Sequence, residues 1–409
     1  MKLLVIDTSY NFQAIKEKKL YEAIYSRDLD GYFKKVWSVH PFASISLNSD
    51  QKKKFGKLEI FKINNRHFFI EGKFGRFFAL RKLKIINFLF SQLEIFFFLK
   101  KLIKDENIDY IKSHDPHYNS LLAYLLSKVT RIPFLLRVSG NFDKIFDDTK
   151  KPIVKNFFVF RSIEKTFERF IFKKANFVIA PNNDNLEYAF NNGLKRSKGE
   201  VVRYGSLIYK DHLTNPQSRK EKYFFSKELN LDDRNIYLIY VGRLEKVKRV
   251  MDLIPIMKNI GGTEVKLLIV GKGSLENEIK KAIVSNNLTK TIFLLGEKNQ
   301  EWLSRCLPNC SCFLATHTGR ALAEASFAGL PIVGYDIDWH SEIIKHGFNG
   351  YLAKTDDHLS FSNLILKIVK DKDLSERFSI NLREKAETLL SPKKITEVEI
   401  ECFNKLKKG

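Results

Sequence analysis

The stretch IYLIYVGRLEKVK, residues 236–248, decides the fold. It opens with an apolar, β-branched and aromatic run that predicts a buried strand at Ile236–Val241. Gly242 then allows the chain to turn, and two cations, Arg243 and Lys248, follow five residues apart. Cations just past the end of a strand can bind a diphosphate, arginine through its planar fork and lysine as a point charge. The alternative is a pair of solvated charges at the start of a helix.

The strand-then-helix pattern continues on both sides of this stretch. Downstream, it predicts strands at Lys266–Val270, Thr291–Leu295, Ser311–Ala315 and Pro331–Tyr335, each followed by a helix. Upstream, it predicts strands at Lys2–Asp7, Lys34–Phe42, Lys57–Ile63, a run ending at His114, a run starting at Ile132, Phe177–Asn182 and Gly199–Gly205, and helices near Ala14–Ser26, Lys84–Ile103 and Tyr118–Thr130. Strands that alternate with helices indicate βαβ units around parallel sheets.

The chain of 409 residues is too long for one ordinary core and fits two domains. The polar segment Asp211–Asp233 is the predicted linker between an N-terminal domain (residues 1–210) and a C-terminal domain (residues 234–391). A last helix, at about 392–409, is expected to pack back on the first domain. The predicted fold class is α/β, with two Rossmann-like, doubly wound parallel sheets facing across a cleft that holds the ligand.

A second motif, HTGRALAEASFAGLPIV, spans residues 317–333. Gly319 stands where a strand hands over to a helix, so backbone amides and the helix dipole can meet phosphate oxygens there. Glu324 follows about one and a half turns later, and a carboxylate there can accept two hydrogen bonds from a ribose diol. A surface acid on a helix is the alternative. The segment VGKGSLENEI, residues 270–279, predicts a tight turn at Gly271 that lines the cleft.

The charge of the chain is concentrated in its first half. The net charge is +23, and residues 1–210 hold 39 Lys+Arg against 21 Asp+Glu, whereas residues 211–409 hold 31 against 26. An anionic partner is therefore expected to bind the first half. Gln51–Lys84, with eleven Lys/Arg, two acids and seven Phe, can lie on an anionic membrane leaflet, or it can be a solvated basic face. Nucleic acid is not expected as a partner, since no recognised binding motif appears.

The apolar segment Lys84–Ile103 is the candidate membrane span, but Ser91, Gln92 and Glu94 lie in its middle. A helix buried in the domain or lying on the bilayer is preferred. The first residues, MKLLVIDTSY, do not resemble a signal peptide. The expected location is cytoplasmic and peripheral on the inner face of the plasma membrane. The four cysteines, Cys306, Cys310, Cys312 and Cys402, are predicted to be small buried hydrophobic residues in a reducing compartment.

Several motifs of the second half occur in one order at natural spacings: VGRLEKVK, LLIVGKGSLENEI, LLGE, GRALAEASFAGLPIV and SEIIKHGFNGYLA. Together, over about residues 235–355, they resemble the donor domain of the retaining family 4 glycosyltransferases (glycosyl transferases group 1), which have the two-Rossmann GT-B fold. The first half resembles this family more loosely, through its strand pattern and the segments IDYIKSHDP, IPFLLRVSG and ANFVIAP.

The resemblance implies a role for each matching residue. Arg243, Lys248 and His114 would be catalytic, the two cations at the donor diphosphate and the histidine near the transferred sugar. The acceptor side would comprise Asp115, Gly140, Asn141 and Asp143. The donor side would comprise Gly242, Gly271, Glu297, Thr316, His317, Gly319, Arg320, Ala321, Leu322 and Glu324. The co-substrate would be a UDP- or GDP-linked sugar, with no cofactor and no metal, because two cations and a helix dipole can neutralise the diphosphate.

The sequence departs from the family pattern at one important position. Glu324 matches the second glutamate of an E-x7-E motif, but the first falls at Thr316, so the carboxylate that commonly contacts the transferred sugar is absent. His317, Thr318 and the Gly319 amide are the candidates to replace it. Asp336 and Asp338, two residues apart, are predicted to cap the helix that follows them.

The predicted function is that of a retaining glycosyltransferase. It would move a hexose or N-acetylhexosamine from a nucleotide-sugar to a membrane-proximal or lipid-linked glycan, in the synthesis of capsule, O-antigen or exopolysaccharide. Two alternatives stay open. One is a UDP-sugar epimerase of similar architecture, which would need further acid and base carboxylates. The other is a degenerate, non-catalytic protein that binds sugar nucleotides, suggested by Thr316.

Overall fold

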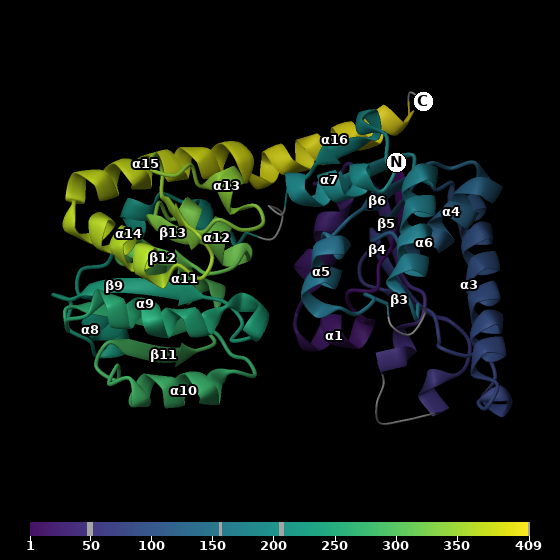
Figure 1. Ribbon diagram of the computed structural model, residues 1–409. Helices are drawn as coiled ribbons and strands as arrows, with labels where there is room; N and C mark the ends of the chain where they lie inside the picture. Colours follow the sequence, from purple (N-terminus) through teal and green to yellow (C-terminus); the bar gives the residue numbers. More distant parts are fainter. Residues whose placement is uncertain (47–51, 155–157, 204–207, 408–409) are drawn as a thin grey trace. The chain divides into compact units, whose positions relative to one another are not determined.

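The computed structural model describes residues 1–46, 52–154, 158–203 and 208–407. The chain forms two compact units, one of Met1–Ser206 with Ile395–Gly409 and the other of Leu207–Lys394. Each unit contains one sheet with helices packed against it (Figure 1). These are the two α/β, Rossmann-like folds that the strand–helix alternation predicts. The N-terminal end of the expected basic stretch, Gln51, and the end of the expected strand 199–205 lie outside the described residues.

The sheet of the first unit has the order β3-β4-β2-β1-β5-β6-β7-β8, and β3 with β4 is its one antiparallel pair. Side chains alternate between its faces: Leu4 and Ile6 join one core, and Leu3 and Val5 join the other. Its strands are β1 Lys2–Ile6, β2 Lys35–His40, β3 Glu59–Lys62, β4 His67–Glu71, β5 Tyr110–His114, β6 Phe134–Arg137, β7 Phe177–Ala180 and β8 Gly199–Val201. Its α-helices are α1 Phe12–Glu17, α2 Tyr21–Tyr25, α3 Lys84–Glu106, α4 Tyr118–Thr130, α5 Phe142–Thr149, α6 Arg161–Lys174, α7 Asn183–Asn191 and α16 Pro392–Lys407.

Strand β4 has no counterpart in the prediction, where its residues belong to the basic stretch 51–84. The pattern is unclear because charged and aromatic residues alternate imperfectly here, yet Phe69 and Ile70 are buried in the sheet. Asn64 forms the turn between β3 and β4, accepting hydrogen bonds from the backbone of Arg66 and His67 at 2.8 Å. The centre of this stretch is therefore part of the sheet and not a segment free to lie on a membrane.

The sheet of the second unit has the order β11-β10-β9-β12-β13-β14 and is parallel throughout. Tyr237 and Ile239 face one core, and Leu238 and Tyr240 face the other. Its strands are β9 Ile236–Val241, β10 Val265–Val270, β11 Ile292–Gly296, β12 Cys312–Ala315, β13 Ile332–Tyr335 and β14 Tyr351–Ala353. Its α-helices are α8 Phe224–Leu229, α9 Leu253–Ile260, α10 Glu276–Ser285, α11 Gln300–Cys306, α12 Arg320–Phe327, α13 His340–Ile343, α14 His358–Lys370 and α15 Lys372–Leu389.

The segment expected as a linker, Asp211–Asp233, is instead an integral part of the second unit. It forms short helical turns and α8, whose Phe224 and Phe225 are buried in the core of that unit. The polar composition that suggested a linker covers only the outer side of these turns. Two buried aromatic side chains are enough to hold the segment against the sheet.

The C-terminal helix α16 belongs to the first unit from Ile395 onward. Ile395, Cys402 and Phe403 are buried with residues of β1, β5 and β7 in one apolar cluster. Glu399, on the same face, pairs with Lys112 of β5 inside this contact. The last helix is therefore attached to the first sheet by both apolar packing and a buried ion pair.

Helix α3 includes the apolar segment considered as a membrane span. Ile95, Leu99 and Ile103 pack into the core of the first unit, so its second half is a covering helix of the sheet. No helix of the described residues is long and apolar enough to cross a membrane. The four cysteines are buried and unpaired, as predicted.

Candidate active site

The carboxyl ends of β9, β10 and β11 meet in a ladder of glycine turns. The Gly242 amide donates to the Val270 carbonyl at 3.0 Å, and the Gly271 amide donates to the Gly296 carbonyl at 2.8 Å. A Cβ on Gly271, where φ is +144°, would lie 1.9 Å from the Gly242 carbonyl oxygen, so only glycine fits there. The residues that follow these turns, including Arg243, therefore lie at the carboxyl edge of the sheet.

Lys248 ends a 3-10 turn (Lys246–Lys248) that follows the first of these strands. Its ammonium donates to the Thr318 carbonyl at 2.6 Å and lies 3.2 Å from His317 Nδ1. Burial lowers the pKa of Lys248, and the positive charge of Arg243 lowers it further, while Asp338 opposes both. The charges of Lys248 and Arg243 are only partly offset by Asp338. The positive potential that remains favours an anionic ligand.

Thr316 and His317 hold this lysine in place. Thr316 is fully buried, and its hydroxyl donates to the Lys248 carbonyl at 2.9 Å. Burial and the Lys248 charge both lower the pKa of His317, which favours the neutral imidazole, whose Nδ1 can accept a hydrogen bond from the ammonium. Thr316 is therefore a support for the Lys248 turn, and the prediction that it contacts the donor is wrong.

Gly319 is the N-cap of α12 and has an extended backbone, with φ at 179° and no side-chain cap. A Cβ placed on Gly319 would meet nothing within 4 Å, so there is open space beside the first turn of the helix. The amides of Arg320 and Ala321 belong to that first turn, where the helix itself supplies no acceptor. Leu322 differs: its amide donates to the Gly319 carbonyl at 3.2 Å and its side chain lies in the core, so it is not a ligand contact.

Glu324 is almost completely buried on α12 and faces a small polar group. Its carboxylate lies 2.8 Å from Nε of Arg320, one turn earlier. Burial raises the pKa of Glu324, while Arg320 and a hydrogen bond from Gln300 oppose that shift. Gln300 in turn contacts Nε2 of the buried His212 at 3.0 Å. A carboxylate held in this way can accept hydrogen bonds from a polar ligand that displaces the flexible Arg320.

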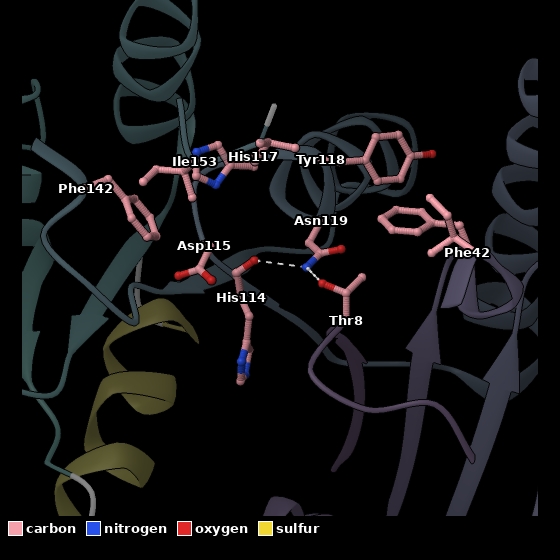
Figure 2. A pocket seen from close by; sticks show the side chains of 11 residues that line it. Thr8, Phe42, His114, Asp115, His117, Tyr118, Asn119, Phe142 and Ile153 are labelled. Atoms are coloured by element: carbon pink, nitrogen blue, oxygen red, sulfur yellow. Dashed lines mark hydrogen bonds between the residues drawn. The ribbon is translucent and has the colours of Figure 1, made fainter. Parts of the chain in front are cut away.

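The first unit has its own pocket of about 540 Å³ at the carboxyl ends of β1 and β5 (Figure 2). Figure 2 shows Phe42 and Tyr118 along one side, and Phe142 with Ile153 along another. Between them, the Asn119 amide donates to Thr8 Oγ1 and to the His114 carbonyl, both at 3.2 Å. Asn119 Oδ1 is buried and has no hydrogen-bond partner among the described residues, so a ligand hydroxyl placed there would satisfy it.

His114 ends β5 at the rim of this pocket, and Asp115 follows it. Burial lowers the pKa of His114 to about 4, although Asp7, whose carboxylate lies 3.6 Å from Nδ1, opposes the shift. The imidazole is therefore neutral at pH 7. Asp115 has φ at +62°, and its carboxylate accepts hydrogen bonds from the amide and hydroxyl of Ser139 at 2.9 and 2.7 Å. This bond fixes the start of the loop that contains Gly140.

Asn141 and Asp143 of that loop have structural partners. Asn141 caps α5, accepting a hydrogen bond from the Lys144 amide at 3.2 Å. Asp143 pairs with Arg161 at 2.9 Å and with Lys165 at 3.0 Å. Both side chains therefore help to hold α5 and α6, and their place on the acceptor side stays a prediction.

Among the described residues, two groups of acids and histidines lie close enough to hold a metal by distance alone: His117, Glu164 and Glu168, and Asp252, Asp356 and His358. An arginine already neutralises the acids of each group. Arg161 donates to both glutamates of the first group, and Arg249 pairs with both aspartates of the second group. Both groups are therefore closed ion networks in this structure.

Residues 221–385 match the family model described as glycosyl transferases group 1. The chain is 26% identical, over 74% of its length and 80% of the relative, to the N,N'-diacetylbacillosaminyl-diphospho-undecaprenol alpha-1,3-N-acetylgalactosaminyltransferase of Campylobacter jejuni. It is 25% identical, over 68% of its length and 70% of the relative, to the UDP-Gal:alpha-D-GlcNAc-diphosphoundecaprenol alpha-1,3-galactosyltransferase of Escherichia coli. The chain is a glycosyltransferase, and its residues 221–385 resemble the group 1 family.

The fold of this glycosyltransferase also has solved counterparts. HepE of Anabaena, solved in complex with UDP, superposes with a TM-score of 0.71 at 15% identity, over 99% of this chain and 100% of HepE. Sucrose-phosphate synthase from Thermosynechococcus elongatus superposes with a TM-score of 0.69 at 15% identity, over 99% of each chain. At these identities the likeness shows the shared GT-B fold, as predicted.

In the second unit of the glycosyltransferase, the structure brings several predicted residues together. Lys248 contacts the 317–318 turn, Arg243 lies close enough to affect its pKa, and Gly319 begins the helix that bears Glu324. Glu297 directly follows the Gly296 turn and is exposed, so it lies at the same edge of the sheet without a direct contact to Lys248.

Other residues of the glycosyltransferase sites have no signal in the local sequence. Gln300 reaches Glu324 from α11, His212 contacts Gln300 from another segment, and Asp338 reaches the 317–318 turn from the loop after β13. Asp338 does not cap α13, whose N-cap is Trp339 with no side-chain hydrogen bond. The pocket of the first unit likewise takes Thr8, Phe42, His117, Tyr118, Asn119 and Phe142 from separate elements.

Proposed function

We propose that this glycosyltransferase moves a hexose or N-acetylhexosamine, with retention of configuration, from a UDP-linked donor to a lipid-linked glycan in cell-surface polysaccharide synthesis. The observation that carries the proposal is Lys248, held at the Thr318 carbonyl next to the uncapped start of α12, with the charge of Arg243 near enough to lower its pKa. This arrangement fits a nucleoside diphosphate, whose charge needs cations and free amides. Glu324, further along the same helix, is the group proposed to bind the ribose.

Each donor-side group has a distinct role in the proposed reaction. When the bond between the sugar and the diphosphate breaks, negative charge develops on the leaving phosphate. Lys248, already oriented by the Thr318 carbonyl, and Arg243 stabilise that charge together with the amides of the first turn of α12. Because these groups supply the neutralisation, the proposed reaction uses no metal ion.

The pocket of the first unit is proposed to bind the acceptor. Its aromatic and aliphatic sides suit the apolar face of a sugar ring, and the unpaired Asn119 Oδ1 suits a hydroxyl. Neutral His114 at its rim would donate or accept a hydrogen bond near the transferred sugar. The acceptor hydroxyl would approach from the side of the leaving diphosphate, whose oxygen takes its proton.

The names of the relatives support a lipid-linked acceptor and retention. Both name an undecaprenol diphosphate carrier and an alpha-1,3 linkage, and the Escherichia coli enzyme takes UDP-Gal. Galactose is α-linked to the diphosphate in UDP-galactose, so an alpha product means that the configuration is kept. HepE adds a relative in fold that binds UDP.

The test of this function is a transfer assay. We expect purified protein to release UDP from one of UDP-glucose, UDP-galactose, UDP-N-acetylglucosamine or UDP-N-acetylgalactosamine only when a polyprenyl-diphosphate-linked sugar is present. NMR of the product is expected to show an α linkage. A β linkage would contradict retention. An epimerised donor formed without acceptor would favour the epimerase, and UDP binding without any turnover would favour a non-catalytic binding protein.

The outer face of α3 is proposed as the membrane contact. In the first half of this helix the usual amphipathic order is reversed: Asn87 and Ser91 are buried and bond to the Phe77 and Lys73 carbonyls, while apolar side chains face outward. Exposed fractions reach 78% for Ile85 and 60% for Phe97. The exposed apolar side chains on this helix and the turn before it are Phe77, Phe78, Leu83, Ile85, Ile86, Leu89, Phe90, Leu93 and Phe97.

Basic side chains lie next to this apolar face. Lys54, Arg81, Lys82 and Lys84 line a pocket of about 610 Å³ together with Phe55 and Phe74. Exposed apolar residues flanked by cations are typical of a surface that enters the interface of an anionic bilayer. The lipid carrier of the proposed acceptor lies in such a bilayer, so this contact would place the enzyme at its substrate, on the inner face of the plasma membrane.

Replacing Leu89 and Leu93 together with glutamate is expected to reduce binding to anionic vesicles at least about 10-fold, because each partly inserted leucine contributes on the order of 1 kcal/mol. Co-sedimentation with phosphatidylglycerol vesicles measures this. Binding by the wild type is also expected to fall at high salt. Leu359→Glu, at an exposed leucine of α14, is the matched control and should bind normally. Unchanged binding of the Leu89/Leu93 variant would exclude this face.

A further inference from the structure

The loop after β13 holds an aspartate in an unusual conformation. Asp338 has φ at +48°, in the left-handed region that side chains other than glycine, asparagine and aspartate rarely adopt. Such conformations persist where surrounding contacts impose them, and they concentrate at functional sites. No helix requires this one, since α13 begins without a side-chain cap.

The contact that Asp338 makes leads directly to the diphosphate cations. Its Oδ2 accepts a hydrogen bond from the Thr318 hydroxyl at 2.8 Å, and the carbonyl of the same threonine accepts from Lys248 at 2.6 Å. His317 Nε2 lies 3.7 Å from the same carboxylate oxygen. The side chain remains 37% exposed, so part of its carboxylate is open to a ligand.

We propose that Asp338 supplies the carboxylate that binds a hydroxyl of the transferred sugar, in place of the glutamate that the family pattern has at position 316. This inference rests on the donor site proposed above. Thr316 cannot take the role, because it is fully buried and its hydroxyl is used by the Lys248 carbonyl. Asp338 provides the negative charge from a neighbouring loop.

The positions of the two carboxylates fit the two ends of a sugar nucleotide. Glu324 contacts Arg320 and Gln300, and Gln300 belongs to α11, which follows β11. Asp338 comes from the loop after β13, and β13 lies on the opposite side of β12 from β11 in the sheet. Arg243 and Lys248 follow β9, and α12 follows β12. Both strands lie between β11 and β13 in the sheet. A donor with its ribose at Glu324 would therefore direct its sugar toward Asp338.

Asp338→Asn and Asp338→Gly test this inference with little risk to folding, because asparagine and glycine both tolerate the left-handed conformation. We expect both variants to bind UDP within about 2-fold of the wild type, since UDP lacks the sugar. For the best-bound of the four UDP-sugars named above, the affinity gained over UDP is expected to fall about 10- to 100-fold, the effect of losing a hydrogen bond to a charged group. The turnover number should fall as well.

Asp336→Asn is the matched control, since this aspartate lies two residues away, is exposed and has the same charge. It should bind UDP and the UDP-sugar like the wild type. Normal UDP-sugar affinity and turnover in both Asp338 variants would overturn the inference while leaving the donor site intact. Failure of the wild type to bind UDP at all would overturn the proposed donor site, and this inference with it. Isothermal titration and the transfer assay provide both readouts.

Discussion

Lys248→Ala is expected to lower the turnover number of sugar transfer about 10²- to 10³-fold, the usual effect of removing one preorganised group from developing charge. The Thr318 carbonyl and His317 orient the ammonium before any substrate binds. No reorganisation is then needed when the diphosphate leaves. The initial rate of UDP release at saturating donor measures the effect, and UDP affinity is expected to change much less than the turnover number.

Lys246→Ala is the control for this variant. Lys246 belongs to the same 3-10 turn and carries the same charge, but its side chain is exposed. It should leave the rate unchanged, which separates a specific role of Lys248 from a general loss of positive charge. A Lys248→Ala rate within about 3-fold of the wild type would exclude it as the group that stabilises the leaving diphosphate.

The lowered pKa of Lys248 also predicts a pH effect. A lysine whose pKa is below its ordinary value loses its ammonium charge at a lower pH than an exposed lysine does. The kcat/KM of the wild type, which reports the free enzyme, is therefore expected to fall on the alkaline side as this group deprotonates. The residual activity of Lys248→Ala should lack that alkaline limb.

Glu399→Gln is expected to destabilise the first unit by about 3–5 kcal/mol, the usual loss when one partner of a buried ion pair is removed. Glu399 pairs with Lys112 and lies 3.7 Å from Arg137, and all three are nearly inaccessible to solvent. Neutralising the carboxylate removes the ion-pair partner of the buried Lys112 and the negative charge beside Arg137. Chemical denaturation, followed by a probe in the first unit, measures the change.

The pH dependence of this difference follows from the pKa of Glu399. Burial acts to raise that pKa, but Lys112 and Arg137 outweigh it and hold the pKa below its ordinary value. The stabilisation is therefore complete above the pKa of an unfolded glutamate and is lost as the pH falls through the depressed folded value. The difference in unfolding free energy between wild type and Glu399→Gln should shrink on acidification.

Glu397→Gln is the control, since Glu397 is exposed on the same helix. It should change the free energy of unfolding by no more than about 0.5 kcal/mol. A similar loss in both variants would argue against the ion pair.

The sequence predicted the elements whose signal is local. Runs such as Ile236–Val241 are apolar on every residue because both faces of a parallel strand are buried. Strands β9 to β13 lie within one residue of prediction, whereas the short strand β14 was not predicted. The glycines at strand ends and the helix bearing Glu324 were predicted for the same reason. Strand β4 was missed because charged residues interrupt its alternation of apolar and polar side chains. The outward apolar face of α3 was not predicted because the composition of a helix does not show which of its faces packs against the sheet.

The sequence by itself determined the two α/β folds, the positions after β9 of the two cations proposed to bind the diphosphate, and the absence of a carboxylate at Thr316. Only the tertiary structure decided which side chains complete each site. Asn141 and Asp143 found partners in the neighbouring helices, and Asp338 contacts the 317–318 turn beside Lys248 although it lies 90 residues after Lys248 in the chain. The physical reason is that backbone propensity and apolar periodicity act over a few residues. A polar side chain instead takes whichever partner the packing of distant segments places within hydrogen-bond distance.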